Sequence, residues 1–219
     1  MERETEIWLI SAAALTAVSG WYYFSKKEKA GRRVLVFKAL ATLMPVLLAL
    51  RASLSASSWG QPCGWLIFCG AFFCMTADVL LELVFLTGVF SFALAHICFL
   101  AAFIHMVHIR WYTVFLFVLL FLFMLLFHDK VVPRFGKQSV FLYAYGALLC
   151  AMTAMAVSAA LQHPGGKGVV TAAGGICFYL SDNILGWRIL NERKERSLGA
   201  VLLVLYYGAV YLIAASCLL

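Results

Sequence analysis

The chain is divided almost from end to end into apolar runs, each long enough to cross a membrane as a helix. A transmembrane helix needs about 20 mostly apolar residues, and these runs are continuous rather than alternating, which favours helices over barrel strands. Only 12% of the residues are charged, whereas a soluble domain has about 25%. We therefore predict an all-α integral membrane bundle of eight transmembrane helices, forming a single domain over residues 1–219. The expected spans lie near residues 5–24, 33–51, 63–84, 88–107, 110–128, 139–161, 168–189 and 198–217.

The basic residues predict how the bundle sits in the membrane. Twelve of the 17 Lys and Arg residues lie in or beside the connections after the first, fifth and seventh spans. Short cytoplasmic connections are enriched in these residues, so we expect both termini on the opposite, lumenal or outer, side. The net charge of +7 then reflects membrane topology, and we expect no nucleic acid partner.

The seven cysteines form no C-x-x-C pair and no Cys/His array of the metal-binding kind, so we expect no metal. We expect no organic cofactor either.

Two carboxylates, Asp78 and Asp182, stand inside apolar runs, in the segments FCGAFFCMTADVLLEL and AAGGICFYLSDNILGW. An aspartate near the bilayer centre costs roughly 2.5–3.5 kcal/mol on insertion scales. Ionisable residues within membrane spans usually face the bundle interior and mark functional sites. We therefore take the two aspartates as candidate catalytic residues.

Further polar residues are expected at the depth of the two aspartates. Because alternate spans run in opposite directions with a rise of 1.5 Å per residue, groups from five spans fall in the half of the membrane nearer the basic connections. A cavity open to the cytoplasm would bring them together, and we predict that the two aspartates face each other across it. The supporting or substrate-binding candidates are Lys38, His96, Ser181, Asn183, Tyr206 and Tyr207.

Plainer interpretations exist for several of these residues. Lys38 and Asp78 also fit a structural ion pair, and His96 alone fits a hydrogen-bonded interior histidine. Glu82 stands one helical turn after Asp78 and close to the membrane edge, where snorkelling of its side chain to the headgroups is the better interpretation. The two adjacent tyrosines also fit packing or interfacial positions.

Short motifs follow one another in a fixed order from the second span to the last. They are Lys38 with Pro45-Val46, Ala77-Asp78, Ala95-His96, Tyr145-Gly146, Phe178-x-x-Ser181-Asp182 and Tyr206-Tyr207. Each is weak alone, but their order and placement in successive spans resemble the lysoplasmalogenase family of multipass membrane proteins. The sequence departs from that pattern at Ala77 (glycine in the family), Phe99 (tyrosine) and Val210 (glutamine), which bears on substrate choice and activity.

The resemblance implies a hydrolase acting on ether bonds without a cofactor. Its substrate would be a vinyl-ether lysolipid taken from the membrane lipid and cleaved to a fatty aldehyde and glycerophospho-ethanolamine or -choline. Two buried carboxylates suit this chemistry, because one can protonate the enol-ether carbon while the other, ionised, stabilises the oxocarbenium ion or activates water. We expect an endoplasmic reticulum membrane, and the charge distribution places the active-site layer toward the cytoplasm. A homo-oligomer is compatible with the sequence.

Two other functions stay open at this point. A non-enzymatic lipid-binding or transport protein of the same fold would use the same cavity, although a transporter needs access from both sides of the membrane and the polar layer lies in one half. A structural scaffold would tolerate replacement of both aspartates by asparagine without functional loss.

Overall fold

The computed structural model describes residues 2–55, 59–128, 136, 138–191 and 195–219. Within these residues it contains eight α-helices and no strand, and all eight helices are long and apolar enough to cross a membrane. The predicted all-α, eight-helix architecture is thus confirmed. The helices are α1 (Glu2–Ala30), α2 (Leu35–Leu54), α3 (Gln61–Leu83), α4 (Phe85–Met106), α5 (Trp111–His128), α6 (Gln138–Gln162), α7 (Gly166–Leu190) and α8 (Arg196–Ala215), with a short 3-10 helix, η1 (Gly31–Val34), between α1 and α2.

Several helices extend beyond the apolar runs that predicted them. α1 ends at Ala30 and includes Lys27 and Lys29 in its last turn, where cations interact favourably with the helix dipole. α3 and α4 are separated by Val84 alone, whose extended backbone (φ −141°) ends one helix and starts the next. An apolar run therefore marks the part of a helix that lies in the membrane core and not the ends of the helix.

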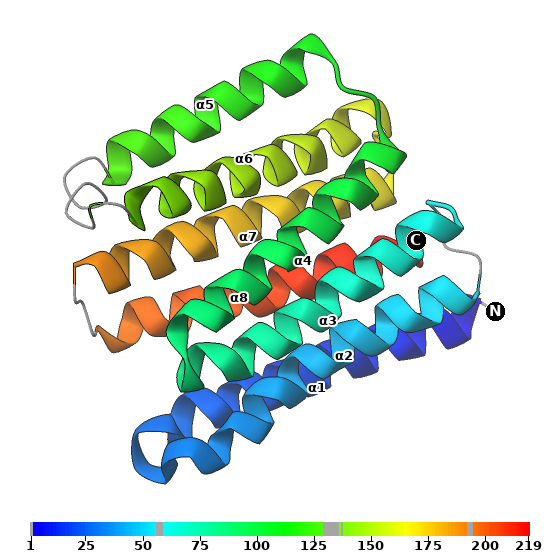
Figure 1. Cartoon of the computed structure of the whole chain (residues 1–219). Helices are drawn as coiled ribbons and strands as arrows, with labels where there is room; N and C mark the ends of the chain where they lie inside the picture. The colour runs from blue at the N-terminus through cyan, green and yellow to red at the C-terminus, as the bar shows by residue number, and fades with distance from the viewer. Residues whose placement is uncertain (1, 56–58, 129–135, 137, 192–194) are drawn as a thin grey trace.

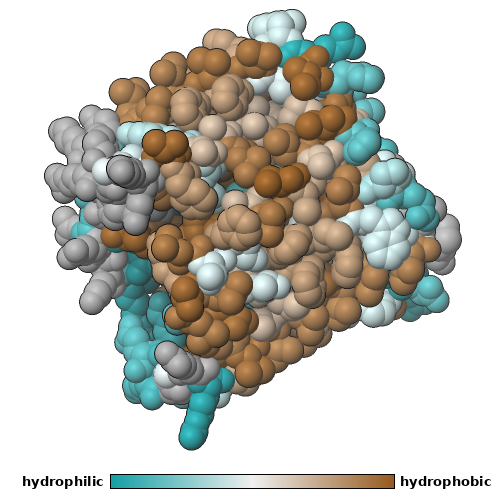
Figure 2. Space-filling model, in the orientation of Figure 1, coloured by the Kyte–Doolittle hydropathy of each residue, from teal (hydrophilic) through white to brown (hydrophobic). Residues whose placement is uncertain are grey.

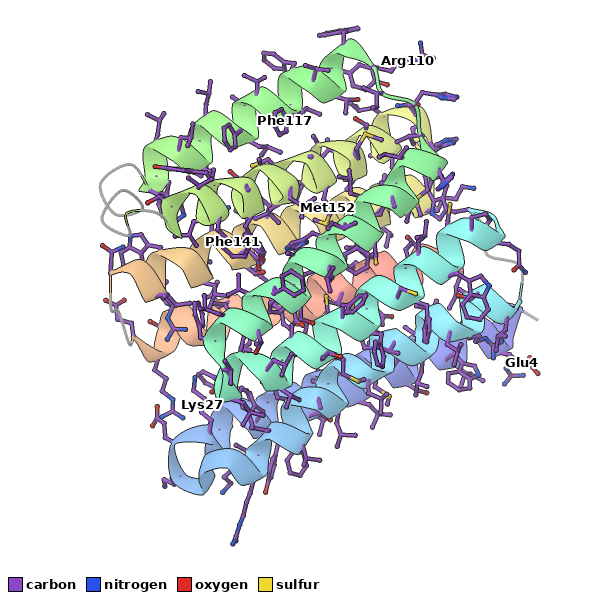
Figure 3. All side chains as sticks on the ribbon, viewed as in Figure 1. Glu4, Lys27, Arg110, Phe117, Phe141 and Met152 are labelled. Carbon is purple, nitrogen blue, oxygen red and sulfur yellow. The ribbon has the colours of Figure 1, made fainter. Side chains whose placement is uncertain are left out.

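Helices that follow one another in the sequence mostly pack side by side, and α8 returns to close the bundle (Figure 1). α8 contacts α7 and also α1, α2 and α3, whereas α5 lies at the edge and packs mainly on α6. Both termini lie at one end, which we call the terminal end (Figure 1). The opposite end, where α1 leads into α2 and α3 joins α4, is called the basic end. Lys27 marks the basic end and Glu4 the terminal end in Figure 3.

The outer surface has the pattern expected of a membrane protein, with an apolar belt between two hydrophilic ends (Figure 2). Large apolar side chains such as Ile10, Leu126 and Val204 are exposed on the helices. Part of the predicted charge asymmetry lies outside the described residues, namely Lys130, Arg134, Lys137, Arg193 and Lys194. The orientation in the membrane therefore stays a prediction.

A proline in the middle of α2 couples this helix to α1. Pro45 has no N–H, so the carbonyl of Ala41, four residues earlier, lacks its usual helical donor. The Thr16 hydroxyl on α1 donates to this carbonyl at 3.0 Å. In a bilayer a freed carbonyl must find a partner within the protein, so this bond fixes α1 against the face of α2 that carries the candidate site.

Candidate functional site

Asp78 is buried in α3, with 1% of its surface exposed, and its carboxylate is surrounded by groups from α2 and α8. Its Oδ2 is hydrogen-bonded to Thr42 Oγ1 and accepts a bond from the Tyr206 hydroxyl at 3.1 Å. The Lys38 ammonium lies 3.9 Å from Oδ1. Three helices thus converge on one carboxylate, as the cost of an unpartnered charge in a membrane requires. Lys38, Asp78 and Tyr206 were all predicted from the sequence.

Glu82 belongs to the same cluster, although its side chain is 44% exposed, as a position close to the membrane edge predicts. Its Oε1 lies 3.2 Å from Lys38 Nζ and accepts a hydrogen bond from the Tyr23 hydroxyl at 2.6 Å. Lys38 is therefore closer to Glu82 than to Asp78. Lys38 is the fourth residue of α2 and Glu82 the penultimate residue of α3, so the basic end brings both to the same level, where they pair while Glu82 stays partly exposed.

Asp182 is held by a second set of side chains, from α4 and α6. The Tyr145 hydroxyl donates to its Oδ2 at 2.5 Å, and His96 Nε2 lies 3.1 Å from the same oxygen. The Tyr145 hydroxyl and His96 Nε2 are also 3.0 Å apart, so the three groups form a closed triangle. On its other side, His96 Nδ1 faces the Met152 sulfur at 3.3 Å. Met152 lies near the middle of the bundle (Figure 3), and His96 itself is fully buried.

An aromatic layer lies between the two carboxylate clusters. The Phe178 ring is 4.7 Å from the His96 ring and 5.7 Å from the Tyr206 ring, measured between centroids. Phe92 packs edge-on against both Phe178 and Tyr206, at 6.3 and 5.5 Å. The predicted arrangement had the two aspartates facing each other across an open cavity; in this structure Phe178 stands between the residues that bind them.

The remaining predicted residues play different parts. The Ser181 hydroxyl donates to the Phe178 carbonyl at 3.0 Å and lies 3.4 Å from Asp182 Oδ1. Asn183 donates to the carbonyl of Tyr179, one turn earlier on α7, and not to Asp182. Tyr207 is buried, and its hydroxyl has no hydrogen-bond partner among the described residues.

Sequence reasoning missed several residues that complete the two clusters. Thr42 had a signal, because it shares a helix face with Lys38 by the i, i+4 spacing. Tyr145 stands in one of the ordered motifs but was not singled out as a site residue. Tyr23 had no signal, because a tyrosine near the end of a span is ordinarily an interface anchor. The positions that depart from the family pattern, Ala77, Phe99 and Val210, are all fully buried.

The arrangement suits proton transfer by side chains. Each carboxylate has a phenol as one partner, and the second also has an imidazole, so protons can be held or released without water in the core. Within the part of the chain that the structure describes, no group of three or more His, Cys, Asp or Glu side chains is placed to hold a metal ion.

Comparison with known proteins gives one match. The sequence model of the YhhN family matches residues 33–217, which covers α2 to α8 and leaves α1 outside. No curated protein and no solved structure matches the chain.

Proposed function

The chain belongs to the YhhN family, and we propose that it is a membrane-embedded hydrolase that cleaves the vinyl ether bond of lysoplasmalogens. This family contains lysoplasmalogenases. The products would be a fatty aldehyde and glycerophospho-ethanolamine or -choline. The observation that carries the proposal is the pair of buried aspartates, each held by its own set of hydroxyl, imidazole or ammonium groups in the membrane interior.

Vinyl ether hydrolysis begins with transfer of a proton to the enol-ether carbon. The double bond supplies the electron pair for the new C–H bond, which leaves an oxocarbenium ion. Water adds to this cation and loses a proton, and the resulting hemiacetal collapses to the aldehyde and the free glycerol hydroxyl. The reaction therefore needs one group that gives a proton and one that stabilises a cation and takes a proton from water.

Asp78 is the better candidate for the proton donor, because the two hydroxyl groups beside it can donate their own protons to other acceptors. Thr42 and Tyr206 each carry one hydroxyl proton, and each also has a backbone carbonyl in reach, that of Lys38 at 3.1 Å and that of Cys74 at 3.2 Å. When both protons go to these carbonyls, Oδ2 of Asp78 faces two hydroxyl oxygens that can only accept. A protonated carboxyl satisfies that arrangement.

The charges around Asp78 agree with this role. The Lys38 cation has a nearer partner in Glu82, at 3.2 Å against 3.9 Å to Asp78. With Asp78 protonated, Lys38 and Glu82 neutralise each other and the cluster carries no net charge. A neutral cluster costs least in an apolar medium.

Asp182 is the better candidate for the anion. The described contacts of the Tyr145 hydroxyl are Asp182 and His96 only, and its proton points to Oδ2 at 2.5 Å. His96 donates to the same oxygen when Nε2 carries a proton. A carboxylate anion can only accept hydrogen bonds, so two donors on one oxygen match it. A cation formed between the clusters would lie beside the Phe178 ring, which is next to both His96 and Tyr206.

A non-enzymatic lipid-binding or transport protein is the second candidate. The position of Phe178 favours it, because a reacting group that touches both carboxylates must displace or pass this ring.

We also propose that the protein resides in the endoplasmic reticulum membrane with its basic end in the cytoplasm, and that it forms homo-oligomers.

Release of aldehyde from defined lipids tests the proposal. Purified protein is incubated separately with a vinyl-ether lysolipid, an ester lysolipid and a diacyl phospholipid. We expect aldehyde from the first alone. Tight binding of the vinyl-ether lysolipid with no aldehyde above the protein-free control would support the second candidate instead.

A further inference from the structure

A long apolar groove runs between α1 and α8. Its volume is about 470 Å³, within the range of ligand pockets. The lining residues of both helices follow the spacing i, i+3, i+4, i+7, i+8, i+11, so one face of each helix lines the groove. The lining residues on α1 are Ala13, Thr16, Ala17, Gly20, Trp21 and Phe24, and those on α8 are Ala200, Leu203, Val204, Tyr207, Gly208 and Tyr211.

The shape of the groove suits one hydrocarbon chain. Ala13 and Phe24 stand eleven positions apart on α1, which corresponds to about 16 Å at 1.5 Å per residue. Small residues on both helices leave room, and a Cβ added at Gly208 meets no atom within 4 Å. Trp21 and Val204 are 70% and 73% exposed, so the rim opens toward the surrounding lipid. A chain can therefore enter sideways from the bilayer.

The hydroxyl groups of the lining residues are bonded within the protein or closed off from the groove. The Thr16 hydroxyl donates to the Ala41 carbonyl and the Tyr211 hydroxyl to the Leu9 carbonyl, both at 3.0 Å. The Tyr207 hydroxyl is buried without a partner among the described residues. This oxygen has almost no exposed surface, so the ring of Tyr207 lines the groove and its hydroxyl does not.

The groove also reaches toward a charged end and toward Asp78. Phe24, at the basic end of the groove, has Lys27 Nζ 5.8 Å and Arg196 Cζ 5.3 Å from its ring centroid. Neither cation forms an ion pair with a described carboxylate. Arg and Lys together are the side chains that bind phosphate. At the groove's inner wall the Tyr207 ring lies 5.2 Å from that of Tyr206, whose hydroxyl is 3.1 Å from Asp78 Oδ2.

We propose that the α1–α8 groove binds a single-chain phospholipid, with its hydrocarbon chain between the two helices and its phosphate at Lys27 and Arg196. The choice of a single-chain lipid rests on the proposed function. The site depends on α1, which lies outside the region that matches the family model.

Photo-crosslinking locates the bound chain without requiring turnover. The probe is an alkyl-ether lysophospholipid with a diazirine in its chain; because its ether is saturated, protonation of an enol-ether carbon is impossible. Full-length protein in phosphatidylcholine nanodiscs is irradiated with increasing probe, and labelled peptides are mapped. We expect saturable labelling within residues 13–24 and 200–211. Labelling that does not saturate and spreads equally over the exposed face of α5 would overturn the proposal.

Variants test the two parts of the site separately. Gly208→Leu fills the groove from α8 and Ala17→Leu from the exposed face of α1, and each should lower the affinity for the probe about tenfold. Val201→Leu, an exposed position of α8 outside the lining, should leave it unchanged. The double variant Lys27→Gln/Arg196→Gln should weaken the phospholipid probe but not an alkylglycerol probe that lacks the phosphate. Equal affinity of all variants for the phospholipid probe would contradict the proposal.

Aldehyde release by the same preparations separates this inference from the proposed function. Saturable labelling of the groove by a protein that releases no aldehyde from vinyl-ether lysolipid would retain the groove and refute the hydrolase. Aldehyde release with an unchanged KM in Gly208→Leu and Ala17→Leu, together with labelling that does not saturate, would retain the hydrolase and refute the groove.

Discussion

Asp78 and Asp182 are buried carboxylates in one bundle, yet their surroundings differ in kind. The hydroxyls beside Asp78 have backbone carbonyls as alternative acceptors, and a cation and a second carboxylate stand next to it. The donors beside Asp182 point at the carboxylate, with an imidazole among them and no lysine. Because both residues are aspartates, their different roles in catalysis must come from the protons and charges of their neighbours. On this basis Asp78 is the proton donor and Asp182 is the anion.

Replacing either aspartate should have the largest effect. Asp78→Asn cannot supply a proton and Asp182→Asn cannot supply a negative charge, so each should lower kcat for aldehyde release by about 10²–10⁴. Both variants should still insert, because each removes a charge from the membrane. Turnover is compared at equal amounts of monodisperse protein. Near-wild-type rates in both variants would show that the aspartates are structural.

The second cluster should be more sensitive to loss of its donors than the first. Tyr145→Phe removes the 2.5 Å bond to Asp182 and should lower kcat about 10–100-fold, the worth of a hydrogen bond to a charged group. His96→Ala should lower kcat by a factor in the same range, and by less than either aspartate variant. Tyr179→Phe is the matched control, because its hydroxyl bonds the Leu120 carbonyl on α5 and not a carboxylate. A Tyr145→Phe enzyme as active as Tyr179→Phe would remove the distinction between the clusters.

Loss of one hydroxyl beside Asp78 should matter less. Tyr206→Phe leaves Thr42 in place and frees a carbonyl that helical bonding already satisfies, so we expect a decrease in kcat of about threefold to tenfold. Steady-state rates on vinyl-ether lysolipid measure it. A loss as large as that of Asp78→Asn would mean that Tyr206, and not the carboxyl, gives the proton.

Changes at the outer part of the first cluster should be smallest. The side chain of Glu82 is 44% exposed, so its ion pair with Lys38 is worth about 0–1 kcal/mol after solvent screening. Glu82→Gln should therefore lower thermal stability slightly and turnover less than Tyr206→Phe. Lys38→Ala should impair turnover less than either aspartate variant, because it acts through its partners. Thermal unfolding and initial rates of the two variants decide this.

The sequence predicted the helices well, because length and apolarity alone determine a membrane span. It also found both aspartates, Lys38, His96 and Tyr206, since polar groups within a span must face the interior. It did not separate the two clusters, because helix rotation is set by packing, and an apolar residue such as Phe178 carries no signal of where its ring will lie. Tyr23 and Tyr145 escaped for a related reason: a tyrosine in an apolar span is not costly enough to stand out.

The central claim is that the protein gives a proton to the enol-ether carbon of a lysolipid, and the fate of solvent deuterium tests it most directly. The reaction is run in D₂O with a vinyl-ether lysolipid, and the aldehyde is reduced to the alcohol as it forms to prevent exchange. Our account predicts one deuterium on the carbon next to the former carbonyl, with the label-bearing product strongly reduced in Asp78→Asn. Absence of aldehyde, or an aldehyde without deuterium at that carbon, would contradict it.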